Sequence, residues 1–357
     1  MKKKLLSSLL TLTLVLPLLA CTGCGTKKTG EVLTVLNYGK YFDEDKLKQF
    51  EKETGIEVKY DEYESPEEMY TKYKSGSIDY DVICTSEYFV QKLIEEGEVK
   101  EFDYSSLENY SNVDASIVAM TDTYDPEHKF CLPYFYGTLG LLYNTKYVSE
   151  EEASSWDCLW DDKFAGNIIM QDSVRDSFSP ALISLGYSIN TTNKEEINKA
   201  YEILAEQAKN IYGYYVDEAG DLMIGEEAYI ALVYSGEAAY AMDNCDGDFL
   251  AYSVPKEGSN FWVDSWFIPK TCKNDSAAAK FLDYVCRDDV AQANFEYVYY
   301  ASPILSVCEA QDEDTKKNEA INPSKESLDR CELYVSLSDE LTVFYSEIWS
   351  KLLASQN

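Results

Sequence analysis

The chain has 357 residues and carries 64 Asp and Glu side chains against 31 Lys and Arg, which gives a formal net charge of −33. At roughly 150 residues per domain, this length predicts about two domains, each with enough chain for its own core. Hydrophobic residues make up 45% of the chain and charged residues 27%, as in folded globular proteins. Binding to the phosphate groups of nucleic acid needs clustered Lys and Arg, and a chain with this excess of acidic residues would be repelled by them. We therefore exclude nucleic acid as a partner. A single His, His128, excludes metal sites built from several imidazoles.

The N-terminal segment has the pattern of an export signal. Three Lys residues follow the initial Met, and sixteen residues without a charge come next. This apolar run is shorter than the roughly 20 residues of a transmembrane helix, so we predict a secretory signal peptide at residues 1–20. Leu18-Leu19-Ala20-Cys21 resembles a bacterial lipobox, which makes Cys21 the expected lipidated first residue of the exported protein, with Cys24 as the alternative. Residues 21–31 are polar and are expected to form a flexible tether.

Eight further cysteines are spaced too widely to resemble a disulfide scaffold. Cys84 and Cys286 fall inside predicted apolar elements, where a buried free thiol is the ordinary expectation. We therefore expect all eight to be free. Disulfide pairing, which an exported protein permits, is the alternative.

From residue 32 onward, the hydrophobic pattern alternates between strands and helices. In the first series, we predict strands at 32–36, 56–63 and 80–84, and helices at 44–53, from Ser65 with Pro66 in the first turn, and at 87–95. This alternation is typical of a parallel sheet with helices on both faces.

A second series of the same kind begins near Leu139. It contains predicted strands at 139–143, 168–170 and 230–234 and a helix opened by Asn193, with Glu196 completing a capping box. A final helix at 338–354 places four apolar side chains on one face, which is typical of a core-facing helix: Leu341, Phe344, Ile348 and Leu352. The sequence therefore predicts an α/β fold.

Tyr, Trp and Asp residues gather where predicted strands and helices end. They lie at 37–41 after the first strand, at 85–88 after the third, at 261–266 after a Pro-Lys-Glu-Gly turn, and at 299–303. Ligands of open α/β sheets bind outside the carboxyl ends of strands, so we expect these segments to meet at one site. Aromatic faces attract ammonium groups, and carboxylates give them charge-assisted hydrogen bonds. The pattern predicts a site for a cation with apolar stretches.

Motifs of common catalytic sites are missing from the sequence, which has no Gly-x-Gly-x-x-Gly, Walker loop, Gly-x-Ser-x-Gly or His-Glu-x-x-His. Carboxylate pairs such as Asp172 and Asp176 leave glycoside hydrolysis open as an alternative. With 64 acidic residues, however, such pairs are expected by chance. We expect a protein that is not an enzyme and has neither a cofactor nor a metal.

In the aromatic and acidic segments at strand and helix ends, the chain resembles the spermidine/putrescine-binding proteins, the extracellular receptors of polyamine ABC importers. The resemblance runs from about Val32 to the C-terminus and is carried by collinear motifs, among them Asn37-Tyr38-Gly39-Lys40-Tyr41, Leu185-Gly186-Tyr187-Ser188, Phe261-Trp262-x-Asp264-Ser265 and Arg287-x-Asp289-Val290-Ala291. It implies a two-lobe α/β fold with crossing segments and a ligand enclosed between lobes that close around it. By the resemblance, lobe 1 would hold 32–138 and 264–310, and lobe 2 would hold 139–263 and 311–357.

The resemblance also implies a set of ligand-facing residues. Besides Gly39, these are Tyr38, Tyr41, Ser86, Tyr88, Ser173, Asp176, Tyr234, Trp262, Asp264, Tyr300 and Tyr334. Six of them depart from the family's residue types. Tyr38 and Tyr234 replace Trp, Asp176 replaces Glu and Gly39 replaces Thr, and all four are compatible with a polyamine channel of slightly different width. The larger departures are Ser173, where a spermidine binder typically has Asp, and Tyr334, where Gln is familiar. The choice between putrescine and spermidine therefore stays open. Glu87, between Ser86 and Tyr88, is either a further carboxylate of the site or a solvated surface acid.

The implied partners are a polyamine and an ABC permease, with the membrane reached only through the N-terminal lipid on the outer face of the cytoplasmic membrane. We expect a monomer. A rival within the same fold is a ferric-ion receptor, in which adjacent tyrosines such as Tyr299 and Tyr300 serve as phenolate ligands. Trp262 and Asp264 at polyamine-family positions argue against it, since a ring face is no iron ligand.

Overall fold

The computed structural model describes residues 30–216 and 218–355. The predicted signal peptide and the predicted lipidation site Cys21 lie outside these residues. Within the described ranges, no helix combines the length and the apolar character needed to cross a membrane. The eight cysteines of these ranges are free thiols.

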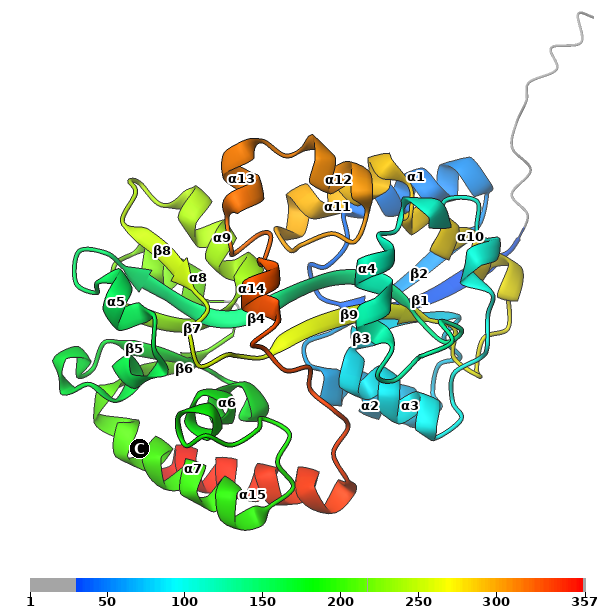
Figure 1. Ribbon diagram of the computed structural model, residues 1–357. Helices are drawn as coiled ribbons and strands as arrows, with labels where there is room; N and C mark the ends of the chain where they lie inside the picture. Colours follow the sequence, from blue (N-terminus) through cyan, green and yellow to red (C-terminus); the bar gives the residue numbers. More distant parts are fainter. Residues whose placement is uncertain (1–29, 217, 356–357) are drawn as a thin grey trace, which may run out of the picture.

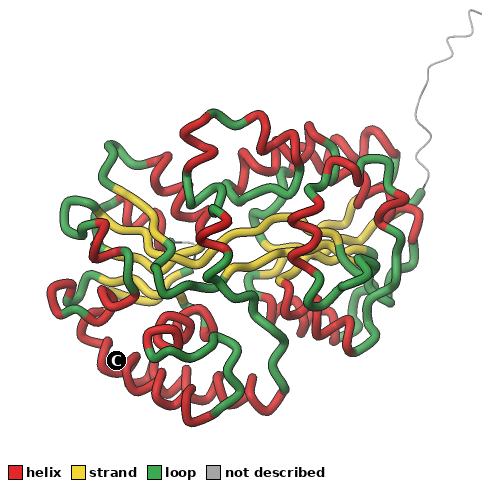
Figure 2. The backbone as a smooth tube through the Cα atoms, in the orientation of Figure 1, coloured by secondary structure: helices red, strands yellow, loops and turns green. Residues whose placement is uncertain are grey.

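A single mixed sheet runs through both halves of the molecule, with helices packed outside it (Figures 1 and 2). Its strand order is β2-β1-β3-β9-β4-β7-β5-β6, and β8 pairs with β4 beside this path. In chain order the strands are β1 Val32–Tyr38, β2 Glu57–Tyr63, β3 Val82–Ser86, β4 Leu132–Asn144, β5 Ile168–Gln171, β6 Ile211–Tyr215, β7 Ile230–Tyr234, β8 Leu250–Ser253 and β9 Phe261–Phe267. Pairings within β1–β3 and within β5–β7 are parallel, as predicted, but every pairing of β4 and β9 is antiparallel. The predicted parallel sheet is therefore wrong at its centre.

Strand β4 belongs to both halves of the sheet. Residues 132–138 pair with β9, whereas residues 139–144 pair with β7 and β8. All 13 residues of β4 are buried, so the strand shows no alternation of apolar and polar side chains. The sequence pattern predicted only its second part, 139–143, and missed the part that joins it to β9.

Buried side chains form separate cores on the two sides of this junction. Leu33 and Phe135 belong to a core with β1–β3, and Leu139 and Leu232 belong to a core with β5 and β7. We call the half that contains β1–β3 lobe 1 and the half that contains β5–β8 lobe 2. The residue limits of the lobes given above stay a prediction.

Helices cover the sheet on both faces (Figure 1). The first nine are α1 Glu44–Thr54, α2 Pro66–Lys74, α3 Glu87–Glu95, α4 Ala115–Val118, α5 Glu150–Ala153, α6 Val174–Ser184, α7 Lys194–Gln207, α8 Ala219–Ile224 and α9 Ser235–Asn244. The remaining six are α10 Asp275–Val285, α11 Asp288–Val298, α12 Leu305–Ala310, α13 Glu313–Lys317, α14 Lys325–Leu328 and α15 Asp339–Ser355. Short 3₁₀ turns, such as Trp156–Trp160, complete the connections.

The N-cap residues predicted from the sequence for α2 and α7 are confirmed, but the capping box predicted for α7 is not. Ser65 caps α2 as predicted, and its hydroxyl accepts a hydrogen bond from the backbone N–H of Glu68. Asn193 caps α7 by accepting from the N–H of Glu195. The predicted capping box is wrong, because the Glu196 carboxylate binds the Thr191 hydroxyl and the Asn193 side-chain amide instead of the Asn193 backbone N–H.

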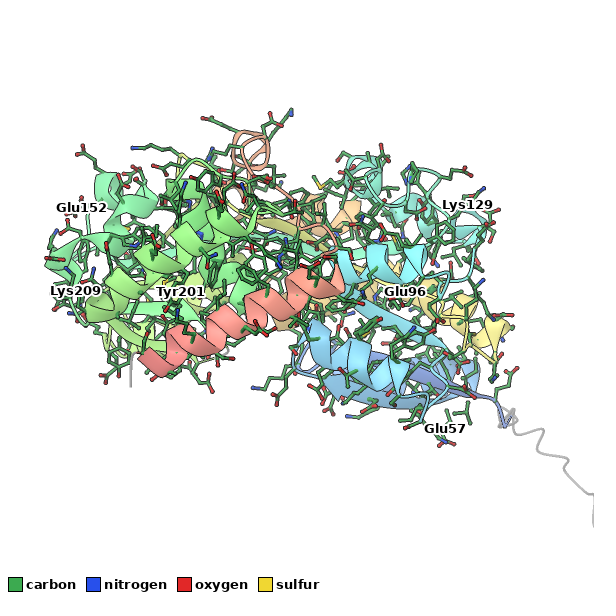
Figure 3. The ribbon with its side chains drawn as sticks, turned by 90° about the horizontal axis from the view of Figure 1, so that it is seen from below. Glu57, Glu96, Lys129, Glu152, Tyr201 and Lys209 are labelled. Atoms are coloured by element: carbon green, nitrogen blue, oxygen red, sulfur yellow. The ribbon has the colours of Figure 1, made fainter. Side chains whose placement is uncertain are left out.

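The C-terminal segment brings the two lobes into contact. Seen from below, α15 runs along lobe 2 and its first turn reaches α3 of lobe 1 (Figure 3). There Lys92 Nζ lies 3.0 Å from an Asp339 carboxylate oxygen, and the Ser336 N–H donates to Gln91 Oε1 at 3.0 Å. On the face predicted to pack inward, Leu341, Ile348 and Leu352 are buried, and Phe344 is only partly so.

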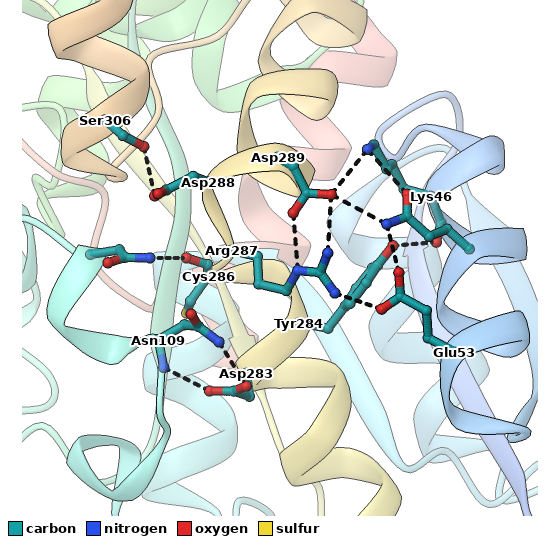
Figure 4. A network of polar contacts seen from close by, with 12 residues as sticks. Lys46, Glu53, Asn109, Asp283, Tyr284, Cys286, Arg287, Asp288, Asp289 and Ser306 are labelled. Carbon is teal, nitrogen blue, oxygen red and sulfur yellow. Dashed lines mark hydrogen bonds and ion pairs between the residues drawn. The ribbon is translucent and has the colours of Figure 1, made fainter.

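A polar network on the outer face of lobe 1 joins elements that are far apart in the sequence (Figure 4). The Arg287 guanidinium lies 2.6 Å from Glu53 on α1 and 3.0 Å from Asp289 on α11. Asp283 on α10 accepts two hydrogen bonds from Asn109, at 2.8 and 2.9 Å. The Arg287-x-Asp289 motif of the resemblance thus fastens the late helices of lobe 1 to its first helix.

Candidate ligand-binding site

Asp264 lies where the carboxyl ends of two parallel strands meet β9. Ser86, the last residue of β3, is its cross-strand partner, and Tyr38 is the last residue of the neighbouring β1. The Tyr41 hydroxyl donates to Asp264 Oδ2 at 2.7 Å. The hydroxyls of Tyr38 and Ser86 lie 2.6 Å apart. Strand termini from lobe 1 therefore surround this carboxylate with hydroxyl groups.

Asp264 is a buried acidic residue without a positively charged partner in the described ranges. Its residue is only 6% exposed, and no Lys or Arg of the described ranges forms an ion pair with it. Burial raises the pKa of Asp264 to about 6, and the hydrogen bonds from Tyr41, Ser86 and Tyr38 oppose that rise. A buried carboxylate in this setting is stabilised by any cation that reaches it.

Aromatic rings extend from Asp264 toward lobe 2. The Trp262 ring meets the Tyr300 ring edge-on at 4.9 Å and the Tyr234 ring at 6.2 Å, measured between ring centroids. Two glycines make room for them: a Cβ at Gly137 would lie 2.7 Å from the Trp262 ring, and one at Gly236 would lie 2.3 Å from the Tyr300 ring. Both contacts are shorter than real Cβ atoms allow, so these positions need glycine for the rings to sit as they do.

Asp176, in the first turn of α6, is the corresponding carboxylate of lobe 2. It is 5% exposed and accepts hydrogen bonds from three hydroxyls, those of Ser173 at 2.5 Å, Tyr234 at 2.7 Å and Tyr334 at 3.2 Å. Burial raises the pKa of Asp176, and these hydrogen bonds oppose the rise. Ser173 therefore supports Asp176 as a neutral donor.

Arg175, which the sequence analysis missed, lies beside Asp176. Its guanidinium stacks over the Tyr334 ring at 4.0 Å and lies 5.6 Å from the Tyr88 ring centre. It donates to the Val335 carbonyl at 2.8 Å and to the Asn190 side chain at 2.9 Å. Its positive charge also lowers the pKa of Asp176, so the lobe 2 end has a fixed cation, unlike the lobe 1 end.

Side chains from the two lobes meet at Tyr88. Its ring meets the Tyr334 ring edge-on at 6.1 Å, and its hydroxyl lies 3.5 Å from Glu67 Oε1 in α2. Burial raises the pKa of Glu67, and the negative charge of Asp176 adds to this rise. The sequence analysis also missed Glu67. This residue lies in the first turn of α2, where an acidic side chain is common because it interacts favourably with the helix dipole.

The structure connects all eleven predicted side chains in one continuous set, which we call the interlobe site. It comprises Tyr38, Tyr41, Ser86, Tyr88, Ser173, Asp176, Tyr234, Trp262, Asp264, Tyr300 and Tyr334. Gly39 is exposed, and its N–H donates to the Tyr63 carbonyl outside this set. Glu87 is fully buried, so its interpretation as a solvated surface acid is wrong.

The geometry does not favour a ferric site at the adjacent tyrosines. The Tyr299 hydroxyl donates to Asp243 on α9 at 3.0 Å, whereas the Tyr300 ring packs against Trp262. The two phenols thus have different neighbours. Across residues 30–216 and 218–355, no three His, Cys, Asp or Glu side chains are grouped so that they could hold a metal ion.

Comparison with known proteins agrees with this geometry. Residues 46–323 match the model of the bacterial extracellular solute-binding protein family. The spermidine/putrescine-binding periplasmic protein of Salmonella typhimurium is 32% identical over 91% of this chain and 92% of its own length. The putrescine-binding periplasmic protein PotF of Escherichia coli is 27% identical over 82% of this chain and 83% of its own length.

Solved structures show the same relationship. The spermidine/putrescine ABC transporter substrate-binding protein PotD from Streptococcus pneumoniae is 34% identical, covers 92% of this chain with all of its own, and superposes with a TM-score of 0.78. The chain therefore belongs to the bacterial extracellular solute-binding proteins, and within them to the spermidine/putrescine-binding protein family. Its two-lobe α/β fold is the one that the sequence predicted.

The buried Asp264 carboxylate predicts a pH-dependent stability. The folded protein holds the Asp264 proton up to about pH 6, whereas the unfolded chain releases it near its ordinary value of 3.8, so this group's contribution to stability is lost as pH rises between these values. A shift of about two pKa units corresponds to about 3 kcal/mol. Between pH 4 and 7, the free energy of unfolding of the ligand-free wild type should therefore fall by about this amount relative to Asp264→Asn.

Urea unfolding of both proteins across this pH range measures the difference. Asp172→Asn is the matched control, because Asp172 is an exposed acid of the same type near the site and should show no such change. A constant difference between Asp264→Asn and the wild type over the whole range would contradict the predicted linkage.

Proposed function

We propose that the protein is an extracellular polyamine receptor that delivers putrescine or spermidine to an ABC permease. The observation that carries this proposal is Asp264, a buried carboxylate that lacks an ion pair with any Lys or Arg of the described residues. A ligand ammonium is the partner that this group lacks. The similarity to a spermidine/putrescine-binding protein and to a putrescine-binding protein supports the same chemistry.

In the proposed complex, one ammonium donates to Asp264 and the ligand methylenes run along the Trp262, Tyr300 and Tyr234 rings. Ammonium groups gain roughly 0.5–2 kcal/mol from each ring face, and the rings also cover apolar carbons. A second ammonium would then approach Asp176. The site binds its ligand without breaking a covalent bond in it, so the protein is not an enzyme and needs no cofactor.

Closure of the lobes is the proposed way in which the ligand becomes enclosed. Contacts between α3 and the segment before α15, including Lys92 with Asp339 and Gln91 with Ser336, support a closed arrangement. The proposed moving bodies are 32–138 with 264–310 and 139–263 with 311–357. A monomer is sufficient for this mechanism, because both carboxylates come from one chain.

The first prediction concerns Asp264 in ligand binding. Asp264→Asn leaves an ammonium without its charged partner, and breaking a buried pair in this way costs about 3–5 kcal/mol. The affinity for putrescine and spermidine should therefore fall at least about hundredfold in isothermal titration calorimetry. Asp172→Asn, an exposed neighbour of the site, should bind both amines as the wild type does. A folded Asp264→Asn protein with wild-type affinity would remove Asp264 from the site.

A second prediction concerns the choice between the two amines. Ser173 offers a hydroxyl where a carboxylate would meet the far ammonium, and it already donates to Asp176. Neutral hydrogen bonds contribute about 0.5–1.5 kcal/mol, against about 1.5–3 for those to charged groups. The wild type should therefore prefer putrescine or accept both amines, and Ser173→Asp should shift the preference toward spermidine.

Competition titrations with the two amines test this preference. A wild type that favours spermidine more than tenfold, together with an unchanged preference in Ser173→Asp, would show that another acid serves the far ammonium. Ser188→Asp is a control, because Ser188 also lies in lobe 2 but binds Glu332 outside the interlobe site.

We further propose that the exported chain is anchored by a lipid on Cys21, on the outer face of the cytoplasmic membrane. The support is the lipobox pattern at Leu18-Leu19-Ala20-Cys21. Cys21→Ala should abolish incorporation of a labelled fatty acid and release the protein from the membrane fraction of cells. Retention of both the label and the membrane association in this variant would instead identify Cys24 as the acceptor.

A further inference from the structure

Glu87 is a carboxyl group directly behind the proposed amine site. It is the first residue of α3 and follows Ser86, whose cross-strand partner is Asp264. Its residue is 0% exposed. Glu87 Oε2 accepts a hydrogen bond from the Val263 N–H at 3.3 Å, one residue from Asp264 on β9, while Oε1 has no hydrogen-bond partner among the described residues. Glu87 is therefore buried against the strand that carries Asp264, and the negative charge of Asp264 acts on it.

Charged and titratable groups on several other elements interact with Glu87. Asp264 on β9 contributes a negative charge, and Arg175 on α6 of lobe 2 contributes a positive one. The Tyr124 phenol, in the segment before β4, also interacts electrostatically with Glu87. The backbone N–H at the start of α3 favours the charged form. No Lys or Arg in the described part of the chain forms an ion pair with Glu87.

Two adjacent buried carboxylates cannot both be ionised cheaply, so one of them keeps a proton. Burial, followed by the charge of Asp264, raises the pKa of Glu87 to about 8. Asp264, which three hydroxyls stabilise as an anion, has the lower pKa of the two. At neutral pH the pair in the empty site therefore carries one negative charge, on Asp264, and one proton, on Glu87.

We infer that Glu87 is a positioning residue of the amine site, which holds a proton while the site is empty and releases it when an ammonium group binds at Asp264. This inference rests on the proposed polyamine function. On binding, the O–H bond of Glu87 breaks and its proton passes to the solvent. The ammonium brings one positive charge and Glu87 gains one negative charge, so the net charge of the pair with its ligand stays at −1.

Glu87 then supplies a further anionic charge at the Asp264 end of the site, opposite the end where Ser173 and Asp176 lie. Because the charge appears only in the complex, the empty receptor avoids the free energy cost of two neighbouring buried anions. The affinity should increase with pH, since a proton is released on binding. A purely structural Glu87 would produce neither proton release nor this pH dependence.

Proton release is measured by isothermal titration of putrescine into the protein at pH 7 in phosphate and in Tris buffer, which differ in ionisation enthalpy. Alkylammonium groups titrate near pH 10, as in Lys, so the ligand itself contributes no proton exchange at this pH. The wild type should release about one proton for each ligand bound. Glu87→Gln keeps the acceptor for the Val263 N–H and should release almost none.

Glu95→Gln is the matched control, because it removes the same charge from an exposed position on the same helix. It should release protons as the wild type does. Between pH 6 and 8, the affinity of the wild type and of Glu95→Gln should rise up to about tenfold per pH unit. That of Glu87→Gln should rise only about twofold over the whole range, because Asp264, with a pKa of about 6, loses its remaining proton there.

Binding by the wild type without proton exchange overturns the inference and leaves the polyamine function intact, even where Glu87→Gln fails to fold. Equal proton release by the wild type and a folded Glu87→Gln also overturns it. Absence of binding to either amine overturns the proposed function and, with it, this inference.

Discussion

A carboxylate that is removed from water needs a positive charge or a proton. Asp264 and Glu87 are both buried without an ion pair to a described Lys or Arg, and hydroxyl groups alone compensate the charge of Asp264. In most proteins such an arrangement is replaced by an ion pair or by apolar residues. In the proposed receptor, the ligand supplies the missing cation. The surrounding Tyr hydroxyls and strand ends fix the position of the carboxylate.

The central antiparallel pairing determines where these groups lie. β9 carries Trp262 and Asp264 and is paired on one side with β3 and on the other with β4. Ser86 is thereby fixed opposite Asp264, while the far part of β4 continues into the sheet of lobe 2. Asp176 on α6 and Tyr234 at the end of β7 reach the same region. One shared sheet thus places two carboxylates from different lobes at the two ends of a single row of aromatic rings.

Sequence patterns predicted the parts of this arrangement that depend on local order. Strand β1 and helices α1 and α3 lie close to their predicted ranges, because β1 is a short apolar run bounded by polar residues and each helix has a buried face with a helical period. The first part of β4 was missed because both of its faces are buried and its pattern is uniform. The eleven residues of the proposed site followed from a resemblance to known motifs, not from local periodicity. The contact between Arg175 and Val335 joins residues that are 160 positions apart, and the burial of Glu87 likewise depends on β9 packing against it. No local pattern reports such packing.

The position of β9 in the chain has a consequence for how the protein folds. Val263 and Glu87 are separated by 176 residues, and strands β5–β8 of lobe 2 are synthesised between them. The early strands β1–β3 consequently present an unpaired edge until β9 is available. Closing so long a loop is slow, and an open strand edge invites pairing with other chains.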